Sequence, residues 1–255
     1  MLLAIDIGNT HIVIGIFDKK ELKIHWRLMS KITRTSDESW ILLNMLLRES
    51  EIKLTQIKGA IISSVVPEVT PAFTRMFSEH SCIKPVVVDS DLNIGLKILY
   101  DDPRAVGADR IVNSVAGFQK YGGPIIIVDF GTATTFDVIT ENYEYLGGII
   151  VPGVETSASL LHRFAARLPQ VEMKFPKELI GRNTEASIQS GLMFGTVELI
   201  DGLVNRIQTE FGRQMQKVAT GGLANLIIPK SKTIHLIEPF LTLEGLRIIY
   251  EEVTA

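Results

Sequence analysis

Cysteine is almost missing from the sequence. Cys82 is the single one among 255 residues, so no disulfide can form within the chain. A lone thiol is typical of a reducing compartment, and we expect Cys82 to be a small buried hydrophobic residue. Long uncharged apolar runs are missing too, and Asp6 interrupts the apolar residues after Met1 before a signal-peptide core could form. We therefore expect a cytoplasmic protein that does not enter a membrane.

The sequence also has no large excess of positive or negative charge. The formal net charge is −3 at pH 7 and basic residues do not cluster, so the sequence offers no electrostatic footprint for nucleic acid. A small anionic ligand would need local positive groups instead. Hydrophobic residues make up 46% and charged residues 22%, which is typical of a packed globular protein.

Motifs of several enzyme classes are missing as well. The sequence contains no G-x-x-x-x-G-K-[ST], no G-x-G-x-x-G after a predicted strand and no G-x-S-x-G. Cys82 has no second cysteine to pair with, and the histidines are not spaced like the ligands of a metal site. These absences argue against metal-hydrolase and thiol mechanisms. The histidines are His11, His25, His80, His162 and His235.

One pattern is present twice. An apolar run suited to a buried strand leads to an aspartate, a glycine follows two positions later, and small hydroxyl or amide residues come next. The two copies are 123 positions apart, close to half of the chain. Their residues are Asp6, Ile7, Gly8, Asn9 and Thr10 in the first copy and Asp129, Phe130, Gly131, Thr132, Ala133 and Thr134 in the second.

A single copy of this pattern would indicate a hairpin turn, with glycine for a positive φ and Asn or Thr for local hydrogen bonds. Two copies favour a functional interpretation, because an aspartate at the end of a buried strand is costly to desolvate and a shared charged partner would explain its recurrence. The carboxylate can hold a hydrated cation, while free N–H groups of the turn face an anion. Two such turns facing each other across a cleft would form a nucleotide-phosphate site.

The order of predicted elements repeats too, which indicates two α/β domains, each with three strands followed by alternating helix and strand. A helix over 107–121 ends at Gly122-Gly123-Pro124. We place the boundary there, between an N-terminal domain, 1–121, and a C-terminal domain, 122–255. Strands are predicted at 2–8, 10–17 and 22–29 and again at 125–130, 133–140 and 144–150.

Capping residues mark the ends of the predicted helices. Ser36 is expected to cap one helix, and Asn183 or Thr184 a longer one. In the longer helix Gly191 and Gly195 lie on one face, where another backbone can approach closely. A helix predicted over 155–168 turns four apolar side chains toward the core: Leu160, Leu161, Phe164 and Leu168.

The segment from Tyr100 to Arg110 lies between the two copies and combines two cations, three carboxylates and a glycine at a predicted helix start. The ordinary explanation is a proline and a glycine leading into a helix, with Asp109 stabilising its first turn. The functional alternative has Asp109 as general base toward a hydroxyl and Arg110 as clamp for a carboxylate. The pattern alone supports both equally.

Five motifs, in their order and spacing, resemble those of type III pantothenate kinases across nearly the whole chain. Each motif alone is weak, but the ordered set is specific. Such kinases belong to the acetate and sugar kinase, Hsp70 and actin superfamily, so the resemblance implies an α/β fold of two duplicated ribonuclease-H-like domains with an ATP cleft between them. It also implies ATP-dependent phosphorylation of pantothenate to 4′-phosphopantothenate, the first step of coenzyme A biosynthesis. The motifs are Asp6 to Thr10, Gly107 to Arg110, Asp129 to Thr134, Gly147 to Gly153 and Thr220 to Gly222.

The resemblance implies a role for each matching position. Asp109 would be the catalytic base that takes the proton from the primary hydroxyl of pantothenate. Asp6 would lie on the magnesium side of ATP, and Asp129 would bind a monovalent cation, K⁺ or NH₄⁺. The residues around ATP would be Asp6, Ile7, Gly8, Asn9, Thr10, His11, Ile12, Val13 and Thr132. Those around pantothenate would be Tyr100, Gly107, Ala108, Asp109, Arg110 and Thr184.

Thr184 matches a threonine that the neighbouring subunit supplies in the family, so the resemblance implies a homodimer with Thr184 contributed across the interface. Two other functions stay open. A superfamily kinase for another small hydroxy acid would share both phosphate loops, although the pantothenate motif argues against it. A non-enzymatic accessory factor in gene regulation would tolerate loss of the three aspartates, all of which are present.

Overall fold

The computed structural model describes residues 1–165 and 167–254. Residue contacts divide the chain into two compact units, one formed by Met1–Ala116 with the chain from Leu241 onward and the other by Gly117–Phe240. The last helix therefore packs with the first unit. The boundary between 121 and 122 stays a prediction about domains, which need not coincide with packing units. No helix among the described residues is both long enough and apolar enough to cross a membrane.

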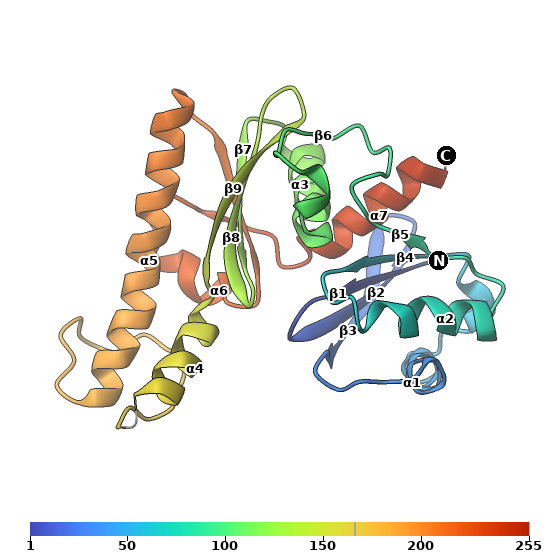
Figure 1. The fold of residues 1–255 in the computed structure, drawn as a ribbon, viewed down its shortest axis with the longest axis horizontal. Coiled ribbons are helices and arrows are strands. Elements are labelled where there is room, and N and C mark those ends of the chain that lie inside the picture. Colours follow the sequence, from blue (N-terminus) through green and yellow to red (C-terminus); the bar gives the residue numbers. More distant parts are fainter. Residues whose placement is uncertain (166, 255) are drawn as a thin grey trace. The chain divides into compact units, whose positions relative to one another are not determined.

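The first unit is built on a five-stranded sheet in the order β3-β2-β1-β4-β5 (Figure 1). Its first three strands form an antiparallel meander, and β4 and β5 continue the sheet in parallel. The strands are β1 Leu2–Ile7, β2 His11–Asp18, β3 Glu21–Met29, β4 Gly59–Ser64 and β5 Val86–Val87, and a further short strand, β6, spans Lys97–Ile98.

Helices cover both faces of this sheet (Figure 1). Leu3, Ile5 and Ile7 of β1 pack with α1 and α2, whereas Gly15 on the opposite face lies against Leu243 of α7. A strand buried on both faces is a nearly continuous apolar run, which is why β1 could be recognised in the sequence. The helices are α1 Ser36–Glu49, α2 Thr70–His80, α7 Leu241–Thr254 and α3 Ala108–Tyr121, of which residues 108–116 belong to this unit.

The second unit repeats the arrangement with strands in the order β11-β10-β7-β8-β9. Ile126, Val128 and Phe130 of β7 pack with α5 and α6, while Gly117, near the end of α3, lies against Ile127 on the other face. The strands are β7 Ile125–Phe130, β8 Ala133–Ile139, β9 Glu144–Pro152, β10 Gln216–Gly221 and β11 Leu236–Ile237. The helices are α4 Val154–Phe164, α5 Thr184–Phe211 and α6 Ala224–Ile227.

The two units are duplicates in detail. β1 and β7 begin 123 positions apart and have the same length and the same burial pattern, and β3 and β9 also begin 123 positions apart with equal length. In both meanders the second and third strands carry a register irregularity at matching places. The prediction of a duplicated α/β chain is confirmed, as is the capping of α5 by Asn183, whose side chain accepts a 2.8 Å hydrogen bond from the Ala186 N–H.

Two local predictions are wrong. The residue that caps α1 is Thr35 and not Ser36, because Thr35 and Glu38 exchange side-chain to backbone hydrogen bonds in a capping box. Cys82 is exposed, since it lies in the irregular segment after α2 and outside the core.

The prediction of a helix over 155–168 is also wrong, both in its length and in the burial of its apolar side chains. The helix is α4, which ends at Phe164, and its apolar side chains are uncovered in the single chain: Leu160 is 44%, Leu161 40% and Phe164 76% exposed. Leu168, beyond the helix, is half-buried. Periodicity identifies an apolar face, but it does not say what covers that face.

Candidate functional site

The first aspartate of the duplicated pattern lies at the end of β1. Asp6 is half-buried and is flanked in the sheet by Val13 of β2 and Ser63 of β4. The following turn joins β1 to β2, and its Gly8 N–H donates to the His11 carbonyl at 3.0 Å. This N–H is used inside the turn, so an anion would have to bind the other groups of the loop.

The first turn is braced by the residue that follows β3. The Ser30 N–H donates to the Thr10 carbonyl at 3.0 Å, and the Ser30 hydroxyl donates to the Gly8 carbonyl at 2.6 Å. Ile7 and Ile12, on either side of the turn, are fully buried in the core. Their buried side chains anchor the two ends of the loop in the core, so only their backbone atoms could contact a ligand.

The catalytic candidate, Asp109, lies in the first turn of α3. Its Oδ1 accepts a 2.7 Å hydrogen bond from the Arg110 N–H, and a Cβ placed on Gly107 would lie 2.6 Å from the same oxygen. Position 107 therefore has to be glycine for the carboxylate to fold back over the helix start. Arg110 is buried, 7% exposed, and its positive charge acts on this carboxylate.

Burial raises the pKa of Asp109 above its ordinary value. The hydrogen bond from the Arg110 N–H and the charge of Arg110 lower the pKa again, but they offset only part of the rise. A carboxylate with a raised pKa is a stronger base than a surface carboxylate. It suits proton abstraction from an alcohol.

Val65 connects the end of β1 with the start of α3 inside the first unit. Its N–H donates to the Ile7 carbonyl at 3.0 Å, and its side chain would contact a Cβ at Gly107 at 3.5 Å. The Asp6 turn and the Gly107 to Arg110 motif therefore lie next to each other. This bridge could not be predicted from the sequence, because Val65 resembles any apolar residue after a buried strand.

The second aspartate, Asp129, lies in the second unit and close to another glycine. A Cβ on Gly221 would lie 2.5 Å from Asp129 Oδ1, and Gly221 has a φ of +92°. A Cβ at this position would also lie 2.6 Å from the backbone nitrogen and oxygen of Phe130, so the Asp129 carboxylate and the β7 backbone pack directly against the glycine at the end of β10. Thr220, the sheet neighbour of Asp129, donates its hydroxyl to the Glu238 carbonyl at 2.7 Å.

The second turn is braced as the first one is. The Gly153 N–H donates to the Thr132 carbonyl at 3.0 Å, and the Thr156 hydroxyl donates to the same oxygen at 2.7 Å. Gly153 follows β9 as Ser30 follows β3, and the two are again 123 positions apart. Its Cβ would lie 2.6 Å from the Thr132 carbonyl oxygen, so the contact requires glycine. The repeat interval could have revealed Ser30 as a bracing residue.

The remaining predicted residues lie at the surface of their units. Tyr100 follows β6 and is 37% exposed, Thr132 is exposed in its turn, and Thr184 is the exposed first residue of α5. The structure thus groups Asp6 to Val13 with Gly107 to Arg110. In the other unit it groups Asp129 with the Thr132 turn, while Thr184 stands apart at the start of its helix.

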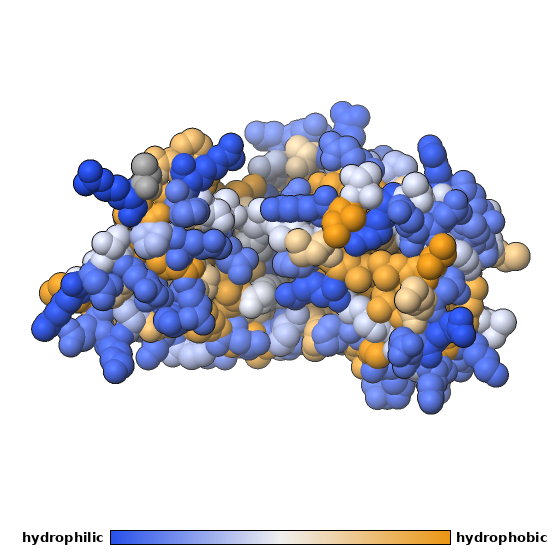
Figure 2. Space-filling view, turned by 90° about the horizontal axis from the view of Figure 1, so that it is seen from below, coloured by the Kyte–Doolittle hydropathy of each residue, from blue (hydrophilic) through white to orange (hydrophobic). Residues whose placement is uncertain are grey.

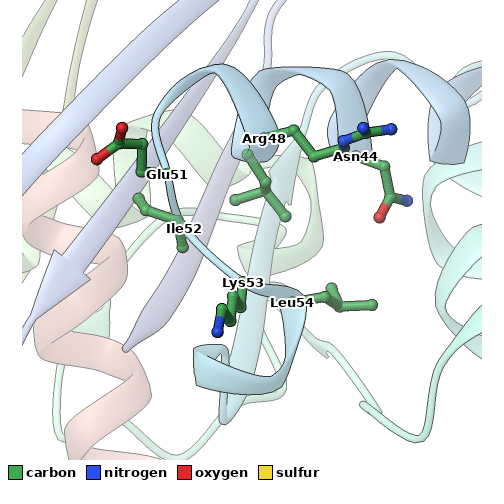
Figure 3. A pocket seen from close by; sticks show the side chains of 7 residues that line it. Asn44, Arg48, Glu51, Ile52, Lys53 and Leu54 are labelled. Atoms are coloured by element: carbon green, nitrogen blue, oxygen red, sulfur yellow. The ribbon is translucent and has the colours of Figure 1, made fainter.

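A pocket of about 510 Å³ lies elsewhere in the first unit, beside the C-terminal end of α1 (Figure 3). It contains basic and acidic side chains together, so it concentrates charge of neither sign. None of the predicted site residues lines it. The lining residues are Asn44, Leu47, Arg48, Glu51, Ile52, Lys53 and Leu54.

The chain is similar to known proteins over most of its length. The sequence model of the type III pantothenate kinase family matches residues 2–206. A type III pantothenate kinase from Moorella thermoacetica is 48% identical over 254 residues, which is 100% of both chains.

Solved structures show the same fold at low identity. A Campylobacter jejuni protein described as a candidate Baf family transcriptional activator is 18% identical, with a TM-score of 0.62 over 98% of both chains. A candidate N-acetylmannosamine kinase from Listeria monocytogenes is 12% identical, with a TM-score of 0.55 over 98% of this chain and 99% of that one. These two likenesses concern the fold alone. The family match and the 48% identical relative show that the chain belongs to the type III pantothenate kinase family.

Proposed function

We propose that the chain transfers the γ-phosphoryl group of ATP to the primary hydroxyl of pantothenate, with Asp109 as the general base. Family membership supports the reaction. The observation that carries the assignment of the base is the half-buried Asp109 carboxylate, which is folded over Gly107 and has a raised pKa. Because ATP is the phosphoryl donor, the proposal also places the enzyme in the cytoplasm.

In this mechanism Asp109 accepts the hydroxyl proton while the pantothenate oxygen forms a bond to the γ-phosphorus. The bond from that phosphorus to the bridging oxygen breaks, and ADP leaves. Phosphoryl transfer requires mainly positioning and charge neutralisation, so the base has only to orient and deprotonate the hydroxyl. Arg110, Gly107, Ala108 and Tyr100 would hold the acid, with Arg110 paired to its carboxylate.

The residues present fit the two cations that the family implies. Asp6 offers a hard carboxylate oxygen of the kind Mg²⁺ prefers, at the entrance of the turn from Gly8 to Val13. Asp129 lies between two hydroxyl residues, Thr135 of β8 and Thr220 of β10, and a carboxylate among oxygen atoms suits a monovalent cation, K⁺ or NH₄⁺. Bound Mg²⁺ would supply charge neutralisation on the phosphates. Thr132, braced by Gly153 and Thr156, would contact ATP.

A coupled assay for ADP tests the reaction. The purified chain is incubated with ATP, Mg²⁺ and K⁺, with and without pantothenate, and we expect ADP release only when pantothenate is present. Other small hydroxy acids serve as comparison substrates. Faster turnover of one of them would support the alternative of a related kinase, and ATP binding without any turnover would support the accessory-factor alternative.

A homodimer with Thr184 acting in the neighbouring subunit's site completes the proposal. Thr184, Gly191 and Gly195 share one face of α5 and are exposed, and nothing lies within 4 Å of a Cβ at either glycine. The uncovered apolar residues of α4 add hydrophobic surface to the same unit, and Figure 2 shows hydrophobic side chains exposed among hydrophilic ones on one face of the molecule. A second copy of the chain would cover such surface.

Subunit mixing tests this arrangement. Asp109→Asn and Thr184→Val chains are each expected to be nearly inactive alone. If Thr184 acts across the interface, a hybrid dimer contains one intact site, and random mixing restores about a quarter of the wild-type rate. No recovery after subunit exchange would mean that Thr184 acts, if at all, in its own subunit's site.

A further inference from the structure

The C-terminal helix α7 lies outside the part of the chain that the family model matches, yet it is built into the first unit. It packs on β1, β2 and β4. Leu243 fills the space above Gly15, and Tyr250 lies over Gly59, where any side chain would collide with the phenol ring. Arg247 is 7% exposed, forms ion pairs with Glu244 and Glu251 and lies over the Phe17 ring. The helix is therefore firmly attached to the sheet that carries Asp6.

The same helix touches α3 through two contacts. The Thr242 hydroxyl donates a 2.8 Å hydrogen bond to Asn113 Oδ1, and Asn113 is only 1% exposed. At Gly245 the two helix backbones meet, because a Cβ there would collide with the Val112 carbonyl oxygen. This partly buried hydrogen bond, together with the close backbone contact, fixes both the position and the rotation of α3 relative to α7.

These contacts lie one helical turn from the catalytic candidate. Asn113 is four residues after Asp109, so the two side chains lie on the same face of α3, about 6 Å apart along its axis. Val112 belongs to the same turn. At the start of α3 the Gly107 carbonyl accepts from the Arg110 and Ile111 N–H groups, and the Arg110 N–H also donates to Asp109 Oδ1. A helix end of this kind frays easily unless the next turn is anchored.

We propose that Thr242 and Gly245 are positioning residues for the phosphoryl transfer: through Asn113 and Val112, α7 holds the first turn of α3 so that the Asp109 carboxylate stays in its reactive place. This inference rests on the proposed role of Asp109. It gives the 14 residues of α7 a part in the reaction although the proposed site takes no group from them.

The test compares Thr242→Val, which keeps the shape but removes the hydroxyl, with Thr242→Ser, which keeps the hydroxyl. Thr254→Val is the matched control, since the Thr254 hydroxyl donates to the Tyr250 carbonyl of its own helix. We expect Thr242→Val to lower kcat about tenfold, because small displacements of a catalytic group are costly, and to leave the KM for ATP unchanged. Thr242→Ser should restore kcat, and Thr254→Val should leave it unchanged.

Hydrogen exchange supplies a second measurement that needs no turnover. Peptides covering residues 104–114 are followed by mass spectrometry in the chain without substrates. Thr242→Val should speed exchange at the Arg110 and Ile111 amides, and Gly245→Ala, which forces the helices apart, should do so more strongly. Thr254→Val should not change this exchange.

Several results would overturn the proposal. They are an unchanged kcat and unchanged exchange in Thr242→Val, an equal effect of Thr254→Val, or a failure of Thr242→Ser to restore the rate. If Thr242→Val and Gly245→Ala lower the Tm but keep a normal kcat, α7 has only a structural role, and the proposal also fails. If the wild-type chain shows no pantothenate-dependent turnover, the proposed function is wrong. The hydrogen-exchange measurement then still tests whether α7 fixes the start of α3.

Discussion

The substitution Asp109→Asn should separate activity from stability in this protein. Asparagine has nearly the same shape and retains an oxygen that can accept the Arg110 N–H, now at 2.7 Å from Asp109 Oδ1. What it removes is the negative charge and the capacity to take a proton. Loss of a general base lowers kcat by about 10²- to 10⁴-fold, and we expect kcat to fall within this range.

The same substitution should leave the free energy of unfolding at pH 7 unchanged or raise it. Because burial raises the pKa of Asp109 in the folded chain, the native state holds this proton more tightly than the unfolded state does, and the ionised carboxylate costs folding free energy at neutral pH. The cost is fully present above the raised pKa, shrinks as the pH falls through it and vanishes below the unfolded value of about 3.9. Asp109→Asn should therefore be at least as stable as the wild type at pH 7, and this advantage should disappear toward pH 3.

The two effects are measured on the same preparations. Coupled ADP release gives kcat, and urea unfolding at several pH values gives the free energy of unfolding. Asp101→Asn, an exposed aspartate of the same segment, is the control for a general loss of negative charge and should leave both quantities unchanged. A variant that keeps a third of the wild-type kcat would refute the base assignment. A variant that is clearly less stable at pH 7 would refute the argument from burial.

Three further substitutions test the second unit. Asp201 is 6% exposed and accepts hydrogen bonds from Ser231, Lys232 and Thr233; burial alone would raise its pKa, but these bonds outweigh burial and lower it. Asp201→Ala should cost about 3 kcal/mol in urea unfolding at pH 7, and the loss should shrink as the pH falls through the lowered pKa. Gly221→Ala should cost about 1 to 3 kcal/mol from backbone strain, seen as a lower Tm, with weaker activation by K⁺. Asp129→Asn should raise the K⁺ concentration for half-maximal activity at least about tenfold, while an unchanged K⁺ dependence would remove Asp129 from the cation site.

The sheets could be predicted from the sequence because their central strands are buried on both faces. Ile125–Phe130 is the clearest case, because a short run of four successive isoleucine and valine residues is typical of a strand that is buried on both faces. Short edge strands were less certain. β11 spans only Leu236–Ile237, because its pairing with β10 is limited to Val218 and Ala219.

The site was predictable at the level of motifs and not at the level of contacts. The aspartates and glycines follow from the repeat and from the family resemblance. The Val65 bridge and the raised pKa of Asp109 depend on which segments pack together, and a single sequence does not contain that information. The exposed face of α4 shows the same limit, because the periodicity that places Phe164 in an apolar stripe does not show that this side chain is exposed.

Duplication gave both aspartates the same place in a strand, and small differences around them support different roles. The first hairpin closes between Ile7 and Ile12, whereas the second closes between Phe130 and Thr134 and is one residue shorter. The sheet neighbours differ as well. Asp6 faces an apolar residue, Val13, across the hairpin, but Asp129 faces a hydroxyl residue, Thr135. Oxygen-rich surroundings suit direct coordination of a weakly hydrated monovalent cation, while a carboxylate with an apolar neighbour and a longer phosphate turn suits a magnesium ion that keeps several of its own waters. Under the proposed function, the same duplicated backbone would hold two cations of different chemistry, and the side chains opposite each aspartate, not the aspartates, would distinguish them.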